Sequence, residues 1–521
     1  MTKRNFIILR FLLLLAAAAL LFYKLNRLPI FADEAIYIRW AQLILDDPGR
    51  YAFFALNDGK TPLFIWMLTP FQLLFTDQLL AARVVAVLIG LVQIVVSGIV
   101  VAKMGGSKLA QLLSMVLFAI LPFWYLHNRM ALMDGLLTVA VALGVLAVIQ
   151  LGKQLEQDKK QLPFKEIAFA GLALGFGLLV KIPAILAFPG FGLLLLVLTW
   201  KQQFDIRTFA ISATGMFGVA GALFGLLALH PSFGQLFSRG GDFLYPLSEV
   251  LGGAFKDTIR NLPVYMTYFA QYLSPVLLVT IGVGLFNNPK QKQIHLFLWL
   301  GLLFALPILL MGKVVYPRYL MPAAWFITIS GVFAFDGLVQ VLNSHLRAKS
   351  RKKQSGAALG LVIAALLLAN TLIHGFWFIG QHLTSLAATP YVSADYEQYL
   401  TKWSSGHGIV ETIALLRSES QNSTIAVATE GYFGTLPDAL LVYLHHTPVD
   451  NLYVEGIGQP VEQIPDSFLE RAKTFDRTWL VVNEHRLKMD LADSPLIGEF
   501  CRPEPAPCLQ VWDITELELS R

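Results

Sequence analysis

Charged residues are scarce in this chain. Only 14% of its 521 residues are Asp, Glu, Lys or Arg, whereas soluble proteins carry roughly 25%. Hydrophobic residues make up 56% of the sequence, and the mean hydropathy is +0.60. This composition excludes an ordinary soluble domain and indicates a chain that crosses a membrane many times.

Cysteine is nearly absent as well. The two cysteines, Cys501 and Cys508, both lie in the segment "CRPEPAPC". The chain has no His and Cys cluster at metal-ligand spacing, which argues against a structural zinc centre. On the outer side of a membrane the two thiols could form a disulfide, and two free thiols are the alternative.

The basic excess does not indicate a nucleic-acid partner. The net charge is +5, but basic residues exceed acidic ones by 16 up to residue 379, and acidic residues exceed basic ones by 11 after it. The Lys and Arg residues lie between apolar runs, so they report membrane topology and attraction to anionic membrane lipids.

Long apolar runs dominate the first 379 residues. A run of about 17 to 25 apolar residues spans a bilayer core as a helix, because a helix satisfies its own backbone hydrogen bonds. The first run continues through "LLFYKL" without a polar cleavage region, so we expect an uncleaved anchor. The sequence predicts eleven spans, at about 6–23, 82–102, 109–127, 130–150, 166–180, 182–200, 207–229, 263–285, 294–312, 319–340 and 356–378.

The connections between the runs predict the orientation. Lys and Arg are retained on the cytoplasmic side, and alternate connections carry them, including "GKQLEQDKKQLPFK", "KQQFDIR", "NNPKQKQ" and "HLRAKSRKK". The N-terminus is therefore predicted to be cytoplasmic, and the odd number of spans places the C-terminus outside. Two long loops, 24–81 and 230–262, are then expected on the outer face.

After residue 380 the composition becomes that of a soluble domain. The segments "STIAVAT", "TWLVVNE" and "CLQVWDI" are typical of buried strands, and "HGIVETIALLRS" and "PDALLVYLHH" show helical spacing. We therefore predict an all-α polytopic membrane domain over 1–379 and a small extracytoplasmic α/β domain over 380–521.

Charges of both signs collect on the expected outer face. Charge near membrane depth is costly and tends to mark function. These residues come from five connections: Asp33, Glu34, Asp58, Lys60, Arg83, Arg129, Asp134, Lys181, Lys313 and Arg318.

Several of these residues also have structural interpretations. Asp134 lies about four residues into a span, where a salt bridge to Arg129 or Arg83 would satisfy it. Lys181 is flanked by apolar residues, so its ammonium could extend to the interface. In "PIFADEAIYIRWAQ", Asp33 and Tyr37 share a helix face, while Glu34 could cap the helix start and Asp33 could bind a loop.

One reaction needs both signs of charge at an outer membrane cavity. When a sugar leaves a lipid phosphate, negative charge grows on the departing phosphate, and Arg and Lys stabilise that charge. The acceptor hydroxyl must lose a proton as it attacks, which requires a carboxylate base. This pattern favours a glycosyltransferase that uses a lipid-phosphate sugar donor.

The order of short motifs resembles the GT-C membrane glycosyltransferases of the protein O-mannosyltransferase and aminoarabinose transferase (ArnT-like) superfamily. The motifs are "FADEAIY", "GKTPLFIWML", "ARVVAVLIG", "HNRMALMDGLL", "GLLVKIPAIL" and "YPRYLMPA", within about 1–340. The resemblance implies a polyprenyl-phosphate sugar donor and transfer with inversion on the outer face of the bacterial plasma membrane.

The resemblance also implies roles for individual residues. Asp33 maps to the base or acceptor-orienting acid beside Glu34, and Lys60 maps near the donor phosphate, next to Pro62. Together with the chemistry above, it gives three predicted groups: catalytic Asp33, Glu34 and Asp134; phosphate-binding Lys60, Arg83, Arg129, Lys181, Arg318 and Tyr319; and pocket residues Tyr37, Asp58 and Lys313.

Two departures limit what can be carried over. Thr61 stands where a proline is common, and Gly59 stands where aminoarabinose transferases tend to have an acid that can contact a metal. We therefore expect no obligatory metal or other cofactor, with a divalent cation as the alternative. The acceptor is open between a protein, a glycan and a lipid.

Two other classes of protein remain alternatives. A transporter or flippase of the same lipid would also need a cationic cavity, but such proteins usually show internal repeats and discontinuous helices near the bilayer midplane, and no repeat is evident. A receptor that binds a cell-wall component through its tail would leave the placement of Asp33 and Asp134 unexplained.

Overall fold

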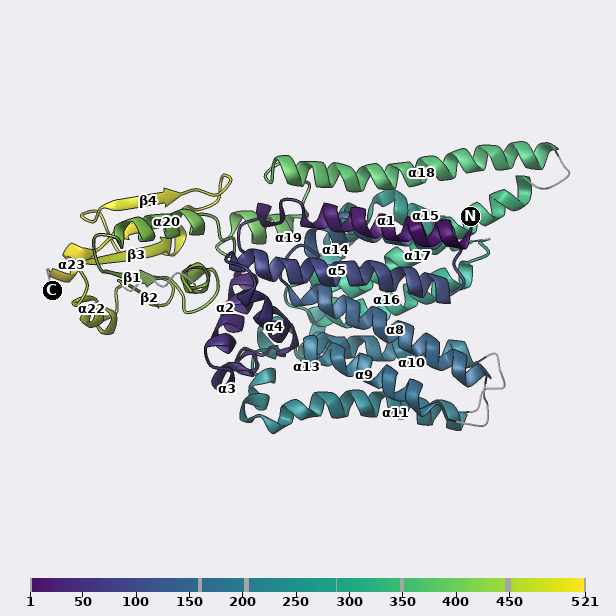
Figure 1. Ribbon diagram of the computed structural model, residues 1–521, viewed down its shortest axis with the longest axis horizontal. Coiled ribbons are helices and arrows are strands. Elements are labelled where there is room, and N and C mark those ends of the chain that lie inside the picture. The colour runs from purple at the N-terminus through teal and green to yellow at the C-terminus, as the bar shows by residue number, and fades with distance from the viewer. Residues whose placement is uncertain are drawn as a thin grey trace. The chain divides into compact units, whose positions relative to one another are not determined.

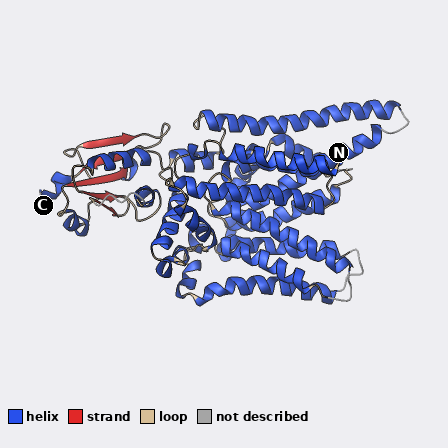
Figure 2. Cartoon of the chain, in the orientation of Figure 1, coloured by secondary structure: helices blue, strands red, loops and turns tan. Residues whose placement is uncertain are grey.

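The computed structural model describes residues 2–157, 162–200, 206–286, 288–346, 351–445 and 451–519. Within these ranges the chain is mainly helical, and the strands lie in the C-terminal part (Figure 2). Four of the predicted cytoplasmic connections, at 152–165, 201–207, 287–293 and 345–353, lie partly outside the described residues.

The chain forms two compact units. The first, which we call the transmembrane unit, contains residues 1–23, 53–64 and 86–384. The second, which we call the tail unit, contains residues 24–52, 65–85 and 385–521. The predicted boundary at residue 379 lies close to the last junction, whereas the sequence had assigned the whole first outer loop to the membrane domain.

Long helices build the transmembrane unit, and in Figure 1 the axes of α5, α8, α16 and α17 are roughly aligned. The helices are α1 (Lys3–Phe22), α5 (Gln78–Lys103, whose first turns belong to the tail unit), α6 (Lys108–Ile120), α7 (Pro122–His127), α8 (Met133–Gln157), α9 (Phe164–Val180), α10 (Phe188–Thr199), α11 (Ile206–Gly225), α12 (Gly240–Phe243), α13 (Leu247–Glu249), α14 (Phe255–Leu273), α15 (Pro275–Gly284), α16 (Gln291–Met311), α17 (Met321–Leu346) and α18 (Arg351–Thr384).

Eight helices of the described residues are long and apolar enough to cross a membrane. Residues 259–284 add a ninth if α14 and α15, bent by 99°, count as one span. The remaining predicted spans correspond to α6, with 13 residues, and α9, with 17. Each of the eleven predicted runs therefore lies in helical structure, and the prediction of a polytopic helical membrane protein is confirmed.

Glycine allows two of these helices to approach closely. A Cβ atom at Gly171 on α9 would lie 2.5 Å from the Val219 Cβ and 2.7 Å from the Met216 carbonyl oxygen on α11. Small residues at such a crossing let two backbones pack in lipid, where there is little hydrophobic force between helices.

The tail unit contains a five-stranded sheet in the order β2-β1-β3-β5-β4. The first three strands in this order are parallel, and β5 pairs antiparallel with both β3 and β4. The strands are β1 (Ile425–Thr429), β2 (Leu452–Gly456), β3 (Arg477–Asn483), β4 (Leu496–Phe500) and β5 (Leu509–Asp513). The three predicted strands are the three central ones, β1, β3 and β5, and the prediction missed both edge strands.

Helices complete the tail unit. The helices that come from residues 385–521 are α19 (Ser393–Tyr396), α20 (Ile409–Glu419), α21 (Leu440–Leu444), α22 (Asp466–Ala472) and α23 (Thr515–Leu519). From the first loop come α2 (Ala32–Asp46) and α3 (Pro48–Tyr51), while α4 (Leu63–Leu68) lies across a boundary of the units.

The start of the first predicted outer loop packs with the tail. The Gly406 amide donates to the Ile30 carbonyl at 2.8 Å, and the Ala32 amide donates to the Ser404 carbonyl at 3.0 Å. Further along α2, the Gln42 side chain donates to the Val442 carbonyl at 3.1 Å. These bonds explain why α2, although distant in sequence, belongs to the tail unit.

Candidate functional site

A buried ion pair joins Asp134 and Lys181 in the transmembrane unit. Asp134 lies in the first turn of α8, where the helix dipole favours a carboxylate, and Lys181 directly follows α9. The Lys181 Nζ lies 2.7 Å from the Asp134 Oδ1, and the side chains are 24% and 4% exposed. The partner of Asp134 is thus Lys181, and not the Arg129 or Arg83 that the sequence suggested.

Two further predicted residues complete this group. Arg318 and Tyr319 lie on the short 3-10 helix Pro317–Leu320, immediately before α17. The Lys181 Nζ lies 4.8 Å from the centre of the Tyr319 ring, and the Arg318 Cζ lies 5.3 Å from it. A ring face attracts cations, so Tyr319 lies beside two positive charges, one of which, Lys181, pairs with the Asp134 carboxylate. We call Asp134, Lys181, Arg318 and Tyr319 the α8 cluster.

A second group of charges forms around Asp58. Its carboxylate makes ion pairs with Lys60 and Arg239, and the Arg239 Nε donates to Asp242 at 3.0 Å. Burial lowers the pKa of Arg239, but hydrogen bonds to Asp242 and Asp58 outweigh it and raise the pKa above its usual value. We call Asp58, Lys60, Arg239 and Asp242 the Asp58 cluster.

The backbone beside Asp58 explains one departure from the family pattern. Gly59 has a φ of +71°, in the left-handed region that favours glycine. A Cβ atom there would also touch the Leu236 carbonyl oxygen at 3.4 Å. An acidic side chain at this position would therefore require a strained backbone.

Lys313 fixes the second predicted outer loop. Its Nζ donates to the Gly241 carbonyl at 2.5 Å, and its backbone amide donates to the Phe243 carbonyl at 2.9 Å. The same Nζ lies 5.6 Å from the centre of the Tyr245 ring. Lys313 thus ties the segment after α16 to residues 241–245.

One apolar group connects the α8 cluster and the Asp58 cluster. Leu56, two residues before Asp58, packs in a buried group with Leu227 and Leu236. Leu179 and Ile182, which flank Lys181 in sequence, pack against the same group. The two charged clusters are therefore held to a common apolar base inside the transmembrane unit.

Arg129 makes contacts that stabilise a helix end. Its Nη1 donates to the carbonyls of Leu21 at 2.7 Å and Tyr23 at 2.9 Å, and more weakly to that of Leu20 at 3.3 Å. These are the last carbonyls of α1, which have no partner within the helix. Its predicted contact with a donor phosphate stays a prediction.

Arg83 and Glu34 form a buried bidentate pair in the tail unit. The Arg83 Nε and Nη2 donate to the Glu34 carboxylate at 2.9 and 2.7 Å, and both side chains are buried. Arg83 also donates to the Leu28 and Pro29 carbonyls, at 2.9 and 3.0 Å. Their predicted roles in catalysis and phosphate binding stay predictions.

Glu34 also fixes the start of α2. Its carboxylate accepts a hydrogen bond from the Phe31 amide at 3.1 Å, so the helix-capping interpretation of Glu34 is confirmed. Asp33 lies in the same first turn and is half-buried, and Tyr37, one turn on, is buried with its ring 6.1 Å from that of Trp40. The rigid Glu34 contacts therefore set the position of Asp33.

Arg239 was not among the residues predicted from the sequence. This residue lies in "SRGGD" within the predicted outer loop 230–262, and its expected exposure on a long loop gave no reason to choose it. Arg239 is a candidate because it pairs with Asp58, which lies 181 residues away in sequence. No local sequence pattern indicates a contact over that distance.

The cysteines are joined by a disulfide, Cys501–Cys508. The one group at metal-ligand spacing among the described residues is Glu499 with these two cysteines. Sulfurs held in a disulfide are not thiolates, the form that binds metal, so this group does not fit a metal centre. The expectation of no obligatory metal stays a prediction.

The chain is similar to a known protein family and to several solved structures. The family described as dolichyl-phosphate-mannose-protein mannosyltransferase matches residues 52–230. Two structures of ArnT from Cupriavidus metallidurans, in the apo state and bound to undecaprenyl phosphate, superpose with TM-scores of 0.57 and 0.59. Each is 14% identical; the matches cover 97% and 98% of this chain and 98% of each ArnT chain.

A third structure is also similar. The oligosaccharyltransferase of Archaeoglobus fulgidus, tethered with an acceptor peptide, has a TM-score of 0.52 and 10% identity, with 92% of this chain and 69% of that chain covered. No curated protein matches the chain. The matches confirm the predicted resemblance and the fold, a GT-C type helical membrane protein with a small C-terminal α/β domain.

Proposed function

We propose that this protein is a membrane glycosyltransferase that moves a sugar from a polyprenyl-phosphate carrier to an acceptor, with inversion, on the outer face of the bacterial plasma membrane. The observation that carries the proposal is the α8 cluster, where Lys181 pairs with the buried Asp134 carboxylate and also lies against the ring of Tyr319, so that three segments distant in sequence are linked through one cation. A membrane-embedded cluster of charges is costly unless function requires it.

The comparisons support the donor class. The family that matches residues 52–230 is described by its use of dolichyl-phosphate mannose, and one of the similar ArnT structures holds undecaprenyl phosphate. Both compounds are polyprenyl phosphates. A carrier of this kind brings an anionic phosphate to the membrane surface, which is the group that Lys60, Lys181, Arg239 and Arg318 are suited to bind.

The chemistry divides between the two kinds of charge. The acceptor oxygen forms a bond to the sugar's anomeric carbon while the bond from that carbon to the phosphate oxygen breaks, and the phosphate keeps the electron pair. Arg and Lys groups stabilise this developing charge. Asp33 takes the acceptor's proton, and the Glu34 and Arg83 pair holds the helix turn that carries Asp33.

Asp33→Asn tests the assignment of the base. The variant keeps the size of the side chain but cannot take a proton, so we expect transfer to fall by about 100-fold or more, with little change in affinity for undecaprenyl phosphate. Transfer is measured with radiolabelled polyprenyl-phosphate sugars from the host lipid extract, in proteoliposomes. Glu470→Gln, on an exposed pair with Lys473, is the matched control.

Two outcomes would overturn this proposal. One is unchanged transfer in the Asp33 variant. The other is movement of the labelled lipid between leaflets by wild-type protein without any sugar transfer, which would instead identify a flippase.

Arg239→Gln tests the cationic residue that the sequence analysis missed. Loss of a charge-assisted contact to phosphate should weaken undecaprenyl-phosphate binding by about tenfold. Arg260→Gln is the control, because Arg260 lies in the same predicted loop, is exposed, and pairs only with nearby Asp257 among the described residues. Equal affinity of the two variants would remove Arg239 from the donor site.

A further inference from the structure

Three loops of the tail unit are tied together at the carboxyl ends of β2, β1 and β3. The Gly431 amide donates to the Gly458 carbonyl at 2.8 Å, which joins the loops after β1 and β2. The Val461 amide donates to the Arg486 carbonyl at 2.9 Å, which joins the loops after β2 and β3. Ligands of open α/β sheets bind at this end of parallel strands.

A buried carboxylate lies at the base of these loops. Glu430 is 2% exposed and directly follows β1. It accepts hydrogen bonds from the Asn483 amide at 2.9 Å, the Asn483 Nδ2 at 2.6 Å and the Arg486 Nη1 at 3.0 Å. Burial raises the pKa of Glu430 although Arg486 opposes the shift. Glu430 thus orients both an amide and a guanidinium.

These oriented groups retain hydrogen-bonding capacity. The Asn483 Oδ1 is buried and has no hydrogen-bond partner among the described residues. The Arg486 guanidinium carries five N–H groups. Among the described residues, its hydrogen-bond acceptor is Glu430. The Arg486 Cζ also lies 4.3 Å from the centre of the Trp403 ring. A buried acceptor without a partner requires an explanation, and a ligand or water supplies one.

Two aromatic side chains stand exposed on the loop after β1. Tyr432 is 72% exposed and Phe433 is 55% exposed. In the described part of 385–519, the other exposed large apolar side chains are Val410 and Leu496. The aromatic pair is not on a loose loop, because the Gly431 bond to Gly458 fixes its base.

Two glycines lie against the side chains of Tyr432 and Trp403. A Cβ atom at Gly458, where φ is +98°, would lie 2.9 Å from the Tyr432 hydroxyl oxygen. A Cβ atom at Gly434 would lie 3.3 Å from the Trp403 ring. Tyr432 and Trp403 therefore each lie against glycine backbone, and Tyr432 remains 72% exposed.

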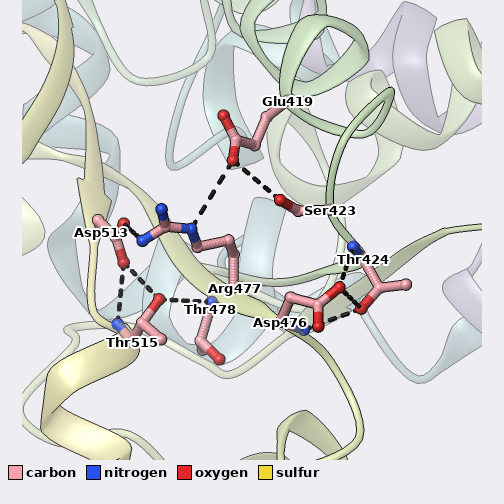
Figure 3. A network of polar contacts seen from close by, with 8 residues as sticks. All are labelled: Glu419, Ser423, Thr424, Asp476, Arg477, Thr478, Asp513 and Thr515. Atoms are coloured by element: carbon pink, nitrogen blue, oxygen red, sulfur yellow. Dashed lines mark hydrogen bonds and ion pairs between the residues drawn. The ribbon is translucent and has the colours of Figure 1, made fainter.

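The opposite end of the same strands differs. Figure 3 shows that polar groups near the starts of β1 and β3 bond to one another: Asp476 accepts from the Thr424 amide and hydroxyl at 2.8 and 2.9 Å, and Arg477 pairs with Asp513 at 3.4 Å. These side chains are paired within the protein. At the carboxyl ends, by contrast, the loops carry both the Arg486 guanidinium and the two exposed aromatic side chains, Tyr432 and Phe433.

We propose that the loops at the carboxyl ends of β1, β2 and β3 bind a saccharide, which serves as the acceptor glycan of the transferase; this role rests on the function proposed above. The apolar C–H face of a sugar ring packs against an aromatic face, whose π electrons make it negative. Hydroxyl groups of the sugar pair with a planar guanidinium, which Arg486 offers with its side chain 16% exposed.

A peptide fits these observations less well. Extended peptides commonly add to the free edge of a sheet, which here would be the outer side of β2 or β4. The exposed aromatics and the oriented polar groups lie at strand ends, where no edge hydrogen bonds are available. The structure therefore favours a saccharide over an extended peptide.

The test compares two double variants of the full-length protein in detergent. Tyr432→Ala with Phe433→Ala removes the aromatic pair, and Val410→Ala with Leu496→Ala removes the two other exposed apolar side chains of the tail. Both are applied to an array of immobilised bacterial envelope oligosaccharides. We expect the first to weaken binding of at least one saccharide class about tenfold or more, and the second to bind as wild type does.

Three results would overturn the inference. The first is that wild-type protein binds no saccharide at millimolar density, and the second is that both double variants bind equally. The third is that the protein binds an array of unglycosylated peptides, used in place of the oligosaccharides, and that this binding requires the aromatic pair. Equal melting temperatures show that both variants fold. Undecaprenyl-phosphate binding is measured on the same samples, so loss of donor binding with intact saccharide binding would count against the proposed function alone.

Discussion

Lys181 and Asp134 illustrate how much one buried pair decides. From the sequence, Asp134 was selected because it lies inside a predicted span and Lys181 because its neighbours are apolar, and each received a different structural interpretation. Pairing them required α8 and α9 to pack, which brings together residues 47 positions apart. Local sequence indicated that each charge was exceptional, and packing identified the partner.

Lys181→Ala should leave the Asp134 carboxylate buried without its countercharge. Breaking a fully buried pair costs roughly 3–5 kcal/mol, and the 24% exposure of Lys181 reduces this, so we expect about 2 kcal/mol. Thermal unfolding in detergent measures the loss. The double variant Lys181→Met with Asp134→Asn should recover most stability without recovering transfer, since the cation for the phosphate is still missing.

A recovery of transfer by that double variant would contradict this assignment. It would mean that the pair contributes only to packing of α8 against α9. Recovery of neither property would instead indicate that other charges depend on the pair for their own positions.

Adjacent carboxylates show the same limit of local reasoning. Asp33 and Glu34 are neighbours, so sequence alone offers either one as a base. The structure fixes Glu34 between Arg83 and the Phe31 amide and leaves Asp33 half-buried. Their difference comes from about 100° of rotation per residue along α2, which turns only one of them toward Arg83.

At the scale of elements, hydropathy predicted helices well and their ends poorly. The predicted span 109–127 is broken into α6 and α7, because Pro122 cannot donate to the helix that precedes it. In the sheet, the missed strands β2 and β4 are the two edges. An edge strand is covered on fewer sides, so it lacks the continuous apolar pattern that identified β1 and β3.

Arg129 belongs to this scale because it acts on a helix end. Arg129→Gln should lower stability by about 2 kcal/mol, since a charged donor to three terminal carbonyls of α1 is lost. Undecaprenyl-phosphate affinity should change little. Thermal unfolding and lipid binding measure the two effects, with Arg4→Gln, on the exposed first turn of α1, as the control.

If Arg129→Gln instead weakened donor binding with unchanged stability, the original prediction that Arg129 binds phosphate would be supported. The experiment thus separates the two roles.

At the scale of the whole molecule, acidification should weaken the tail unit. Burial lowers the pKa of His407 and of His485 below the usual 6.5, and nearby Arg502 and Arg486, respectively, add to this. The unfolded chain binds protons near pH 6.5 while the folded chain binds them only at lower pH. Stability from these groups is therefore lost as pH falls below 6.5.

Hydrogen exchange in β1 and β3 between pH 7 and 5, corrected for the intrinsic exchange rate, measures this loss. The double variant His407→Gln with His485→Gln should flatten the dependence on pH. His345→Gln, on the exposed end of α17, should leave it unchanged. A tail unit equally stable at both pH values would show that the two histidines bind protons equally in the folded and the unfolded chain, which would contradict the prediction.

The sequence by itself determined the order of the apolar helical segments and the three central strands. These features depend on local composition and periodicity, which every segment carries in its own residues. The side chains that were exceptional for their surroundings were visible for the same reason.

Only the tertiary structure decided which charges pair, and which segments share a unit. It joined Asp134 to Lys181, added Arg239 to Asp58, used Arg129 to cap α1, and placed α2 with the tail. Each of these contacts links residues that are distant in sequence. Their energies depend on burial and geometry that arise only when the helices and the sheet have packed.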